Sequence, residues 1–296
     1  MNKKVICFGE VLFDVFPTHL KIGGAPLNVA LRLASLGVQS QIISRIGNDE
    51  KGRELLEFIK NKGIAHSTIQ LDRTLNTGEV TVKLNGQGSA SYTINYPAAW
   101  DKIEFLAEDQ NLVQNADAFA FGSLVCRDSV SFKTLLKLVD NAKFSVFDVN
   151  LRAPFYTKEL LIHLMKLSDF IKFNDDELYE IAHFMETPYH SLEQNIIFIA
   201  EKTNTNQICV TKGCHGAVLY QNGKMFYNSG YKIDVIDTVG SGDSFLAGLL
   251  YKLLNGKNPQ EAIDFACALG AIVAKNSGAN PTISLKEINE FINPLS

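Results

Sequence analysis

The sequence contains no long apolar run, and this absence limits the classes of protein it can encode. No stretch approaches the roughly 20 consecutive apolar residues of a membrane-spanning helix, so we expect no membrane span. The apolar run at residues 5–8 ends at Gly9 and Glu10, which predicts a buried strand rather than a signal peptide. These features favour a cytoplasmic protein.

Cysteines and clusters of basic residues are also scarce. The five cysteines, Cys7, Cys126, Cys209, Cys214 and Cys267, show no C-x-x-C spacing and no histidine pairing typical of zinc sites. Their odd number and mostly apolar neighbours favour reduced thiols. With 28 Lys and Arg against 32 Asp and Glu, the net charge is −4, and no segment concentrates positive charge. We therefore expect no nucleic-acid partner.

Two common nucleotide-binding motifs are missing. The chain has no G-x-x-x-x-G-K-[ST] P-loop. It also lacks the G-x-G-x-x-G turn that follows the first strand of a Rossmann fold, which argues against a nicotinamide-dependent enzyme. Any phosphate site must therefore use another scheme.

What the sequence does contain is a regular alternation of strand and helix patterns. The 296 residues are 46% hydrophobic, which suits a single α/β domain over residues 1–296. Short apolar runs alternate with amphipathic stretches, a pattern typical of a doubly wound, mostly parallel sheet flanked by helices. Strands are predicted at residues 5–8, 41–45, 118–121, 145–149, 170–173 and 207–211, and helices at 25–36, 49–62, 130–139, 158–167, 176–184, 192–202, 244–254 and 259–275.

Two segments follow a hairpin pattern instead. Residues 77–94 alternate between apolar and polar on both sides of Asn85 and Gly86, which predicts a hairpin that turns at that pair. Such alternation suits an antiparallel sheet with one exposed face. A second hairpin is predicted around residues 221–223.

The strongest local motif precedes the helix predicted at 244–254. A Gly-x-Gly turn formed by Gly240, Ser241 and Gly242 leads directly into apolar residues. Glycines let backbone N–H groups crowd toward one point, and a helix N-terminus adds about half a positive charge, so the segment is a candidate anion site. Asp243 beside it is either a general base for an attacking hydroxyl or a simple helix cap.

A second motif starts the first predicted helix. Gly23 and Gly24 allow close backbone approach, and Asn28 projects an amide from the first turn. Taken alone, this segment is equally well explained as a turn and cap.

Together the two motifs resemble the signatures of the PfkB, or ribokinase-like, family of carbohydrate kinases. Gly23, Gly24 and Asn28 are similar to the N-terminal signature, and residues 237–243 are similar to the C-terminal one, with Ser241 where the family more often has Ala. Further similar segments at 148–152, 174–177, 211–213 and 278–279 follow in the family's order, so the resemblance spans nearly the whole chain. Within the family, the opening of the chain, the Gly-Gly-Ala-Pro-x-Asn motif and residues 98–101 are most similar to fructokinases.

The resemblance implies an ATP-dependent kinase that phosphorylates a sugar hydroxyl, most similar to the conversion of fructose to fructose 6-phosphate. Asp243 would be the general base, and Arg152 would sit near the transferring phosphate or the sugar. The implied anion hole is Gly240, Ser241 and Gly242, and the implied sugar-binding residues are Asp14, Gly23, Gly24, Asn28 and Asp243.

The resemblance also implies nucleotide and metal sites. Glu177 would organise Mg²⁺ through water, although Asn174 and Glu177 are also a common helix-capping pair. The implied nucleotide contacts are Asn174, Thr211, Lys212, Gly213, Gly216, Gly240, Gly242 and Asn276. The family is often activated by a monovalent cation such as K⁺, whose ligands would map to Asp237, Val239, Val273, Asn276, Gly278 and Thr282.

A small β lid over the sugar is implied as well, built from residues 14–21 and 77–94, with a homodimer formed through it. Ribokinase, 2-keto-3-deoxygluconate kinase and aminoimidazole riboside kinase are alternatives within the family, and a non-catalytic sugar-binding protein is the alternative class. We expect a neutral ketose, because the candidate sugar-facing segments 13–17, 23–28 and 91–100 contain no Lys or Arg.

Overall fold

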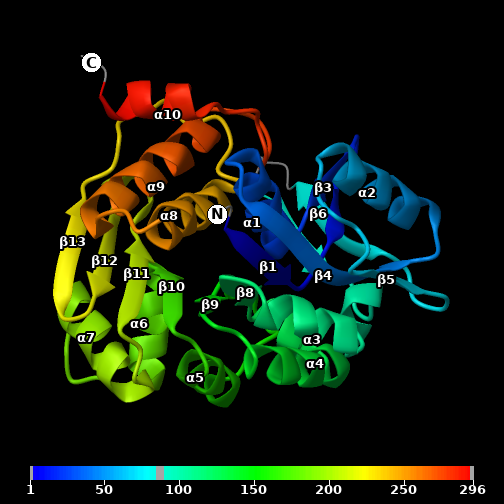
Figure 1. The fold of residues 1–296 in the computed structure, drawn as a ribbon, viewed down its shortest axis with the longest axis horizontal. Helices are drawn as coiled ribbons and strands as arrows, with labels where there is room; N and C mark the ends of the chain where they lie inside the picture. The colour runs from blue at the N-terminus through cyan, green and yellow to red at the C-terminus, as the bar shows by residue number, and fades with distance from the viewer. Residues whose placement is uncertain (1–2, 85–89, 294–296) are drawn as a thin grey trace.

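Two β-sheets organise residues 3–84 and 90–293, the part of the chain that the computed structural model describes (Figure 1). The larger sheet contains β1 Lys4–Phe8, β4 Gln39–Gly47, β5 Ile69–Asp72, β8 Ala118–Gly122, β9 Ser145–Asp148, β10 Phe170–Asn174, β11 Gln207–Thr211, β12 Ala217–Gln221 and β13 Lys224–Asn228. Their order is β13-β12-β11-β10-β9-β8-β1-β4-β5. Every pair from β11 to β5 is parallel, and β12 and β13 add an antiparallel edge. The mostly parallel sheet and the hairpin at 221–223 are therefore confirmed.

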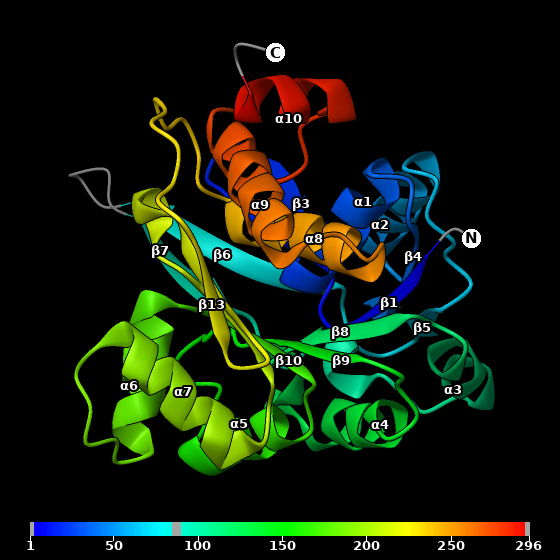
Figure 2. The same cartoon turned by 60° about the vertical axis from the view of Figure 1, so that its left-hand side comes forward.

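Helices cover both faces of this sheet (Figure 2). On one face lie α1 Ala25–Ser35, α2 Glu50–Asn61, α8 Ser241–Leu254, α9 Pro259–Ala274 and α10 Leu285–Ile292. On the other lie α3 Ala107–Gln114, α4 Ser129–Val139, α5 Lys158–Lys166, α6 Asp175–Phe184 and α7 Leu192–Thr203.

The first strand shows why two helical layers form. Val5 and Cys7 pack into the hydrophobic cluster under α1 and α8, whereas Ile6 and Phe8 pack into the opposite cluster. Because successive strand residues point to opposite faces, an uninterrupted apolar strand needs a helix on each side.

The smaller sheet consists of β2 Leu12–Val15, β3 Leu20–Gly23, β6 Gly78–Leu84 and β7 Ala90–Ile94, in the order β3-β2-β6-β7. The predicted pairing of β6 with β7 is antiparallel as expected, but β2 and β6 are parallel, so the sheet is mixed. Between β2 and β6 the chain forms β3 and then contributes β4 and β5 to the main sheet. When it re-enters the small sheet as β6, it runs in the same direction as β2. The predicted range 14–21 was too narrow, and the predicted turn at Asn85 and Gly86 lies outside the described residues.

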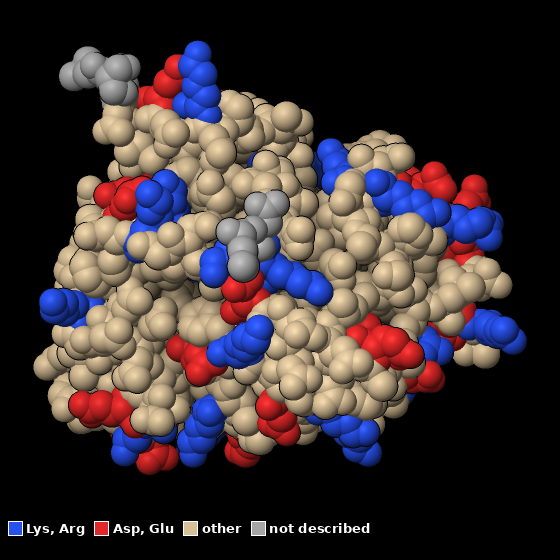
Figure 3. Space-filling view, viewed as in Figure 1, with Lys and Arg blue, Asp and Glu red and all other residues tan. Residues whose placement is uncertain are grey.

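The surface carries mixed charge. On the face seen in Figure 3, Lys and Arg lie among Asp and Glu and form no basic stripe. Among the described helices, none is long and apolar enough to cross a bilayer.

The chain order around β1 predicts where a ligand lies. β1 pairs with β4 on one side and with β8 on the other, so the connections diverge at this strand. In open α/β sheets, ligands bind beyond the carboxyl ends of the strands at such a divergence.

Candidate active site

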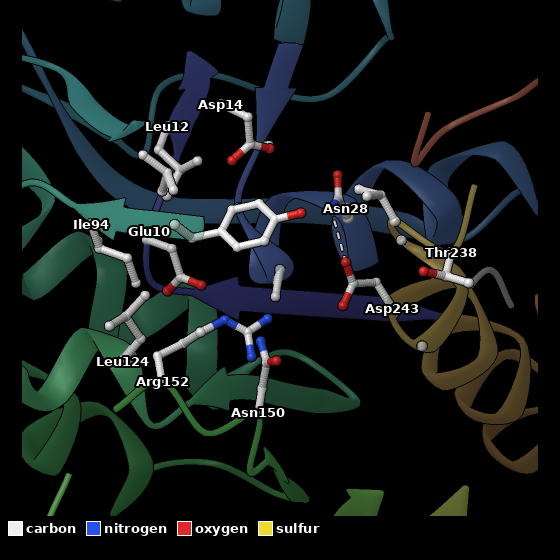
Figure 4. A pocket seen from close by; sticks show the side chains of 18 of the residues that line it. Glu10, Leu12, Asp14, Asn28, Ile94, Leu124, Asn150, Arg152, Thr238 and Asp243 are labelled. Atoms are coloured by element: carbon white, nitrogen blue, oxygen red, sulfur yellow. Dashed lines mark hydrogen bonds between the residues drawn. The ribbon is translucent and has the colours of Figure 1, made fainter. Parts of the chain in front are cut away.

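A cavity of about 600 Å³ lies at the carboxyl ends of β1, β9, β10 and β11, facing the small sheet (Figure 4). Its far end is apolar, formed by Leu12, Ile94 and Leu124. The described lining residues are Glu10, Leu12, Asp14, Gly23, Gly24, Ala25, Asn28, Val80, Tyr92, Ile94, Leu124, Asn150, Arg152, Lys172, Asn174, Glu177, Thr211, Thr238, Val239, Gly240, Gly242 and Asp243. The structure thus brings residues from both sequence motifs to one space.

Asp243 is the third residue of α8 and points toward α1. Its Oδ2 accepts a hydrogen bond of 2.8 Å from Asn28 Nδ2, drawn as a dashed line in Figure 4. Asn280 Nδ2 in turn donates to Asn28 Oδ1 over 2.8 Å and holds that amide in place. The N-cap of α8 is Gly240, so Asp243 is not the cap residue.

The environment of Asp243 suits proton transfer. Burial and the nearby charge of Asp148 raise its pKa to about 6, while the Asn28 hydrogen bond and the positive charges of Lys172 and Arg152 act in the opposite direction. A carboxylate with this pKa is ionised at neutral pH and is a stronger base than an ordinary Asp.

The start of α8 differs from the prediction in two ways. The helix begins at Ser241, so Gly242 has helical backbone and is not part of a turn. The Ser241 N–H also donates to Thr238 O over 3.2 Å, so it is already engaged. Within the described part of the chain, the first-turn N–H groups of α8 without an acceptor are those of Gly242 and Asp243, and these could face an anion.

Gly240 and Ser241 instead fix the position of the helix. Gly240 has φ 74°, and a Cβ there would lie 2.4 Å from the Cβ of Ala279. Ser241 Oγ donates to Gly270 O over 3.0 Å and ties α8 to α9.

The small sheet and the start of α1 supply a second group of polar atoms. Asp14 on β2 points into the cavity, and burial raises its pKa although Lys21 and Arg152 oppose this. A Cβ on Gly23 would lie 2.9 Å from Asp14 Oδ2. Gly24 has φ 113°, and a Cβ there would lie 2.4 Å from Glu10 O. The position of Gly24 therefore requires glycine, whereas the atom near Gly23 is the end of a flexible side chain that can shift.

Arg152 enters the cavity from the side opposite Asp14 (Figure 4). Its side chain is exposed, and Nη1 donates to Leu151 O over 2.8 Å. Burial raises the pKa of Glu10, Asp14 and Asp243, and the charge of Arg152 opposes this rise in each case. Arg152 therefore lies within electrostatic reach of all three.

A second cavity of about 400 Å³ adjoins the first. The described residues that line both are Asn174, Thr211, Thr238 and Gly242. Gly213 and Gly216 line the second cavity as well.

Two predicted nucleotide residues lie outside the described lining of both cavities. The Lys212 N–H closes the loop by donating to Gly216 O over 2.7 Å. Asn276 is exposed and its Nδ2 donates to Ile272 O at the end of α9. Neither side chain belongs to that lining, although the charge of Lys212 acts on Cys267, which lines the second cavity.

Glu177 and Asn174 form the capping pair that the sequence allowed. Each donates its backbone N–H to the other's side chain, at 2.8 Å in both cases. Glu177 Oε1 also accepts from Leu151 N over 2.8 Å. The carboxylate is buried at the cavity wall. Both of its oxygens already accept backbone hydrogen bonds, so a metal-bound water would have to bond to the same oxygens.

The residues predicted to bind a monovalent cation come together only in part. Asp237 accepts from Val239 N and Gly278 N, at 3.0 Å each, and from Lys21 Nζ at 3.3 Å. The Val273 carbonyl accepts the Asn276 N–H over 2.9 Å, and Thr282 is exposed. Among the described residues, no cluster of three or more His, Cys, Asp or Glu could hold a metal ion.

Sequence analysis missed two charged residues of the cavity. Glu10 is 3% exposed, and burial raises its pKa to about 7 while the backbone N–H of Ala25 acts to lower it. Lys172 is 6% exposed and pairs with Asp148. A lone Lys inside the apolar strand 170–173 was a visible signal, because an unpaired charge is not buried without cause.

Comparisons with known proteins agree with this geometry. The profile of the pfkB family carbohydrate kinases matches residues 2–286. A probable fructokinase-7 of Arabidopsis thaliana is 30% identical, with 94% of this chain and 89% of that protein covered. A fructokinase variant from Vibrio cholerae O395, solved with fructose, ADP and potassium, has a TM-score of 0.84 at 23% identity, with 98% of each chain covered. A putative ribokinase II from E. coli, solved with ATP and Mg²⁺, has a TM-score of 0.86 at 23% identity and 99% coverage of each chain. The chain belongs to the pfkB family of carbohydrate kinases and is an ATP-dependent sugar kinase.

Proposed function

We propose that this kinase phosphorylates fructose to fructose 6-phosphate, with Asp243 as general base. The observation that carries the proposal is the Asn28–Asp243 pair at the start of α8, where the two cavities meet. A sugar in the larger cavity would present a hydroxyl to Asp243, and ATP in the smaller one would present its γ-phosphate to the N–H groups of Gly242 and Asp243. The fructokinases among the relatives support the choice of sugar.

The sugar contacts follow from the polar groups around the larger cavity. Asp14 and Asn28 suit the vicinal hydroxyls of a neutral sugar, and Gly23 and Gly24 bring the backbone close to it. The small sheet acts as a lid that excludes water, which would otherwise accept the phosphate. A homodimer formed through this sheet is part of the proposal and follows from the resemblance to the family.

Cofactor binding belongs to the smaller cavity and its junction with the larger one. ATP would contact Asn174, Thr211, Gly213 and Gly216, and bound Mg²⁺ would neutralise phosphate charge, with water between the ion and Glu177. K⁺ would act near Asp237, which contacts Val239 and Gly278. Replacing K⁺ by tetramethylammonium in the assay tests this.

The whole chain is proposed to work as one domain in the cytoplasm. All five cysteines are unpaired and four of them are buried, which suits a reducing compartment.

The decisive experiment is ADP release with Mg-ATP over a panel of sugars that includes fructose, ribose, 2-keto-3-deoxygluconate and aminoimidazole riboside. We expect the highest kcat/KM with fructose and a product phosphorylated at the 6-hydroxyl. Turnover of another panel member with no reaction on fructose would disprove the substrate assignment.

A further inference from the structure

Lys172 is a buried ammonium group in the middle of the main sheet. It lies on β10 between Ile171 and Phe173, both 0% exposed, and is itself 6% exposed. Burying an ammonium group costs several kcal/mol unless it is paired and hydrogen-bonded. Interactions with neighbouring groups must therefore offset the cost of burying the Lys172 ammonium group.

Asp148 supplies the hydrogen bond in that interaction, and the nearby charges of Glu177 and Asp243 also favour the protonated form of Lys172. In the register of β9 and β10 the two residues are direct neighbours, and Lys172 Nζ donates to Asp148 Oδ1 over 2.8 Å. Within the described part of the chain this is the single hydrogen bond of Nζ, and an ammonium group has three donors. Lys172 also lines the larger cavity, so its two remaining N–H donors can bond to a ligand there.

The start of α8 lies beside this ammonium group. A Cβ placed on Gly242 would be 3.8 Å from Lys172 Nζ. Gly242 lines both cavities, and Asn174, one strand repeat beyond Lys172 on the same face of β10, does so too. The positive end of a helix and a buried cation thus converge where the two cavities meet, and that arrangement favours an anion.

Arg152, the cation suggested by the sequence, is less suited to this place. Its side chain is exposed, and its charge acts on Glu10 and Asp14 at the sugar end of the cavity as well as on Asp243. Lys172 is held rigidly by the strand and by Asp148, and preorganised charges stabilise a transition state without reorganisation.

We propose that Lys172 binds the γ-phosphoryl oxygens of ATP during transfer and that Asp148 positions its ammonium group; this rests on the proposed function. In the step, the bond from the γ-phosphorus to the β–γ bridging oxygen breaks and ADP leaves. The sugar oxygen bonds to the phosphorus, and its proton passes to Asp243. Lys172 donates hydrogen bonds to the phosphoryl oxygens throughout and exchanges no proton.

The test uses Lys172→Met, the double variant Asp148→Asn with Lys172→Met, and a control, Lys102→Met. The double variant removes both charges, so it restores the neutrality of the core without restoring the cation. Lys102 pairs with Asp128 over 2.6 Å at a more exposed position and is absent from the described lining of both cavities, so its variant controls for loss of a lysine ion pair away from the site. For each protein we would measure kcat, the thermal midpoint, and the Kd of ADP and of a non-hydrolysable ATP analogue.

We expect Lys172→Met and the double variant to lose about 10²–10³-fold in kcat. Both should bind the ATP analogue at least about tenfold more weakly and ADP within about twofold of the unmodified protein, because only the analogue carries a γ-phosphate. Lys102→Met should retain kcat within about twofold. A double variant that regains kcat, or equal losses for analogue and ADP, would show that Lys172 merely neutralises Asp148. The binding measurements need no sugar, so they decide this assignment even if the fructose assignment fails.

Discussion

The surroundings of Asp243 destabilise its ionised form, as expected for the proposed general base. Burial and the charge of Asp148 raise its pKa to about 6, so its ionised form is disfavoured in the folded protein relative to the unfolded chain. Active sites commonly hold groups in such costly states, because the same environment that destabilises them makes them reactive.

Replacing this carboxylate should separate the two effects. Asp243→Asn keeps an acceptor for Asn28 but cannot take a proton, so kcat should fall at least about 10²-fold with sugar KM within about threefold. The same variant should gain about 1 kcal/mol in free energy of unfolding at pH 7.5. Coupled ADP-release kinetics and thermal unfolding measure these quantities. Activity within a few-fold of the unmodified protein would exclude Asp243 as the base.

The pH dependence follows from the same pKa. The base works only when deprotonated, so kcat/KM should increase with pH through about 6 and level off above about 7. Stability changes with pH in the opposite direction to activity. The pKa of Asp243 is about 6 in the folded protein and about 3.9 in the unfolded chain. The contribution of Asp243 to the free energy of unfolding therefore declines as pH rises from about 4 to about 6. The stability gain of Asp243→Asn should therefore shrink toward zero near pH 4. A gain that is constant with pH would contradict the assignment.

At the scale of the element, the two glycines at the start of α8 have different roles: Gly240 matters for stability and Gly242 for access to the cavities. Gly240→Ala should lower the free energy of unfolding by about 1–3 kcal/mol, because φ is 74° and the new Cβ would meet Ala279 at 2.4 Å. Gly242→Ala should keep or raise the thermal midpoint, since its backbone is helical. It should nevertheless reduce kcat/KM for ATP at least about tenfold, because the methyl group enters the junction of the cavities. Thermal unfolding and ATP titrations test the pair, and equal destabilisation by both changes would refute the distinction.

A second link joins the small sheet to the segment before α8. Lys21 on β3 contacts Asp237 at 3.3 Å, and both side chains are partly exposed. Lys21→Met should therefore raise the sugar KM about three- to fivefold, in line with an ion pair of about 1 kcal/mol, and leave kcat and the thermal midpoint nearly unchanged. Lys3→Met, which breaks a similar pair with Asp117 at 3.1 Å away from the described cavity lining, is the control. Identical sugar kinetics in the two variants would show that the link does not hold the lid.

At the scale of the whole molecule, the balance of charge around the larger cavity bears on the substrate. Among its described lining residues Arg152 and Lys172 are the cations, and the acids are Glu10, Asp14, Glu177 and Asp243. Lys172 is a second cation beside Arg152, which the sequence had suggested, but the four acids outnumber the two cations. We expect kcat/KM for fructose to exceed that for 2-keto-3-deoxygluconate at least about tenfold at saturating Mg-ATP. A tenfold preference for the acid would overturn the neutral-sugar proposal and leave the kinase assignment standing.

The sequence alone predicted most of the main sheet and the chemistry of its two motifs. The predicted strand at 207–211 has the bounds of β11, and other predicted elements differ by a few residues at their ends. Among the described elements, β5, the short helices α3 and α10, and the 3-10 helices at residues 99–102, 124–127 and 213–215 were missed. β5 has four residues and α3 is largely polar, so their periodic signals are weak. In α10, by contrast, Leu285, Ile288 and Ile292 follow helical spacing, so this helix could have been predicted from the sequence.

Features that depend on residues close together in the chain could be predicted from the sequence, whereas contacts between distant segments could not. Apolar periodicity and glycine placement are local, so the sequence by itself determined the two helical layers, the helix that begins at the Gly-x-Gly motif, and the family. Contacts between distant segments depend on how the elements pack, and no local pattern encodes them. Tertiary structure alone therefore decided that Lys172 pairs with Asp148, that Lys21 reaches Asp237, and that β2 runs parallel to β6.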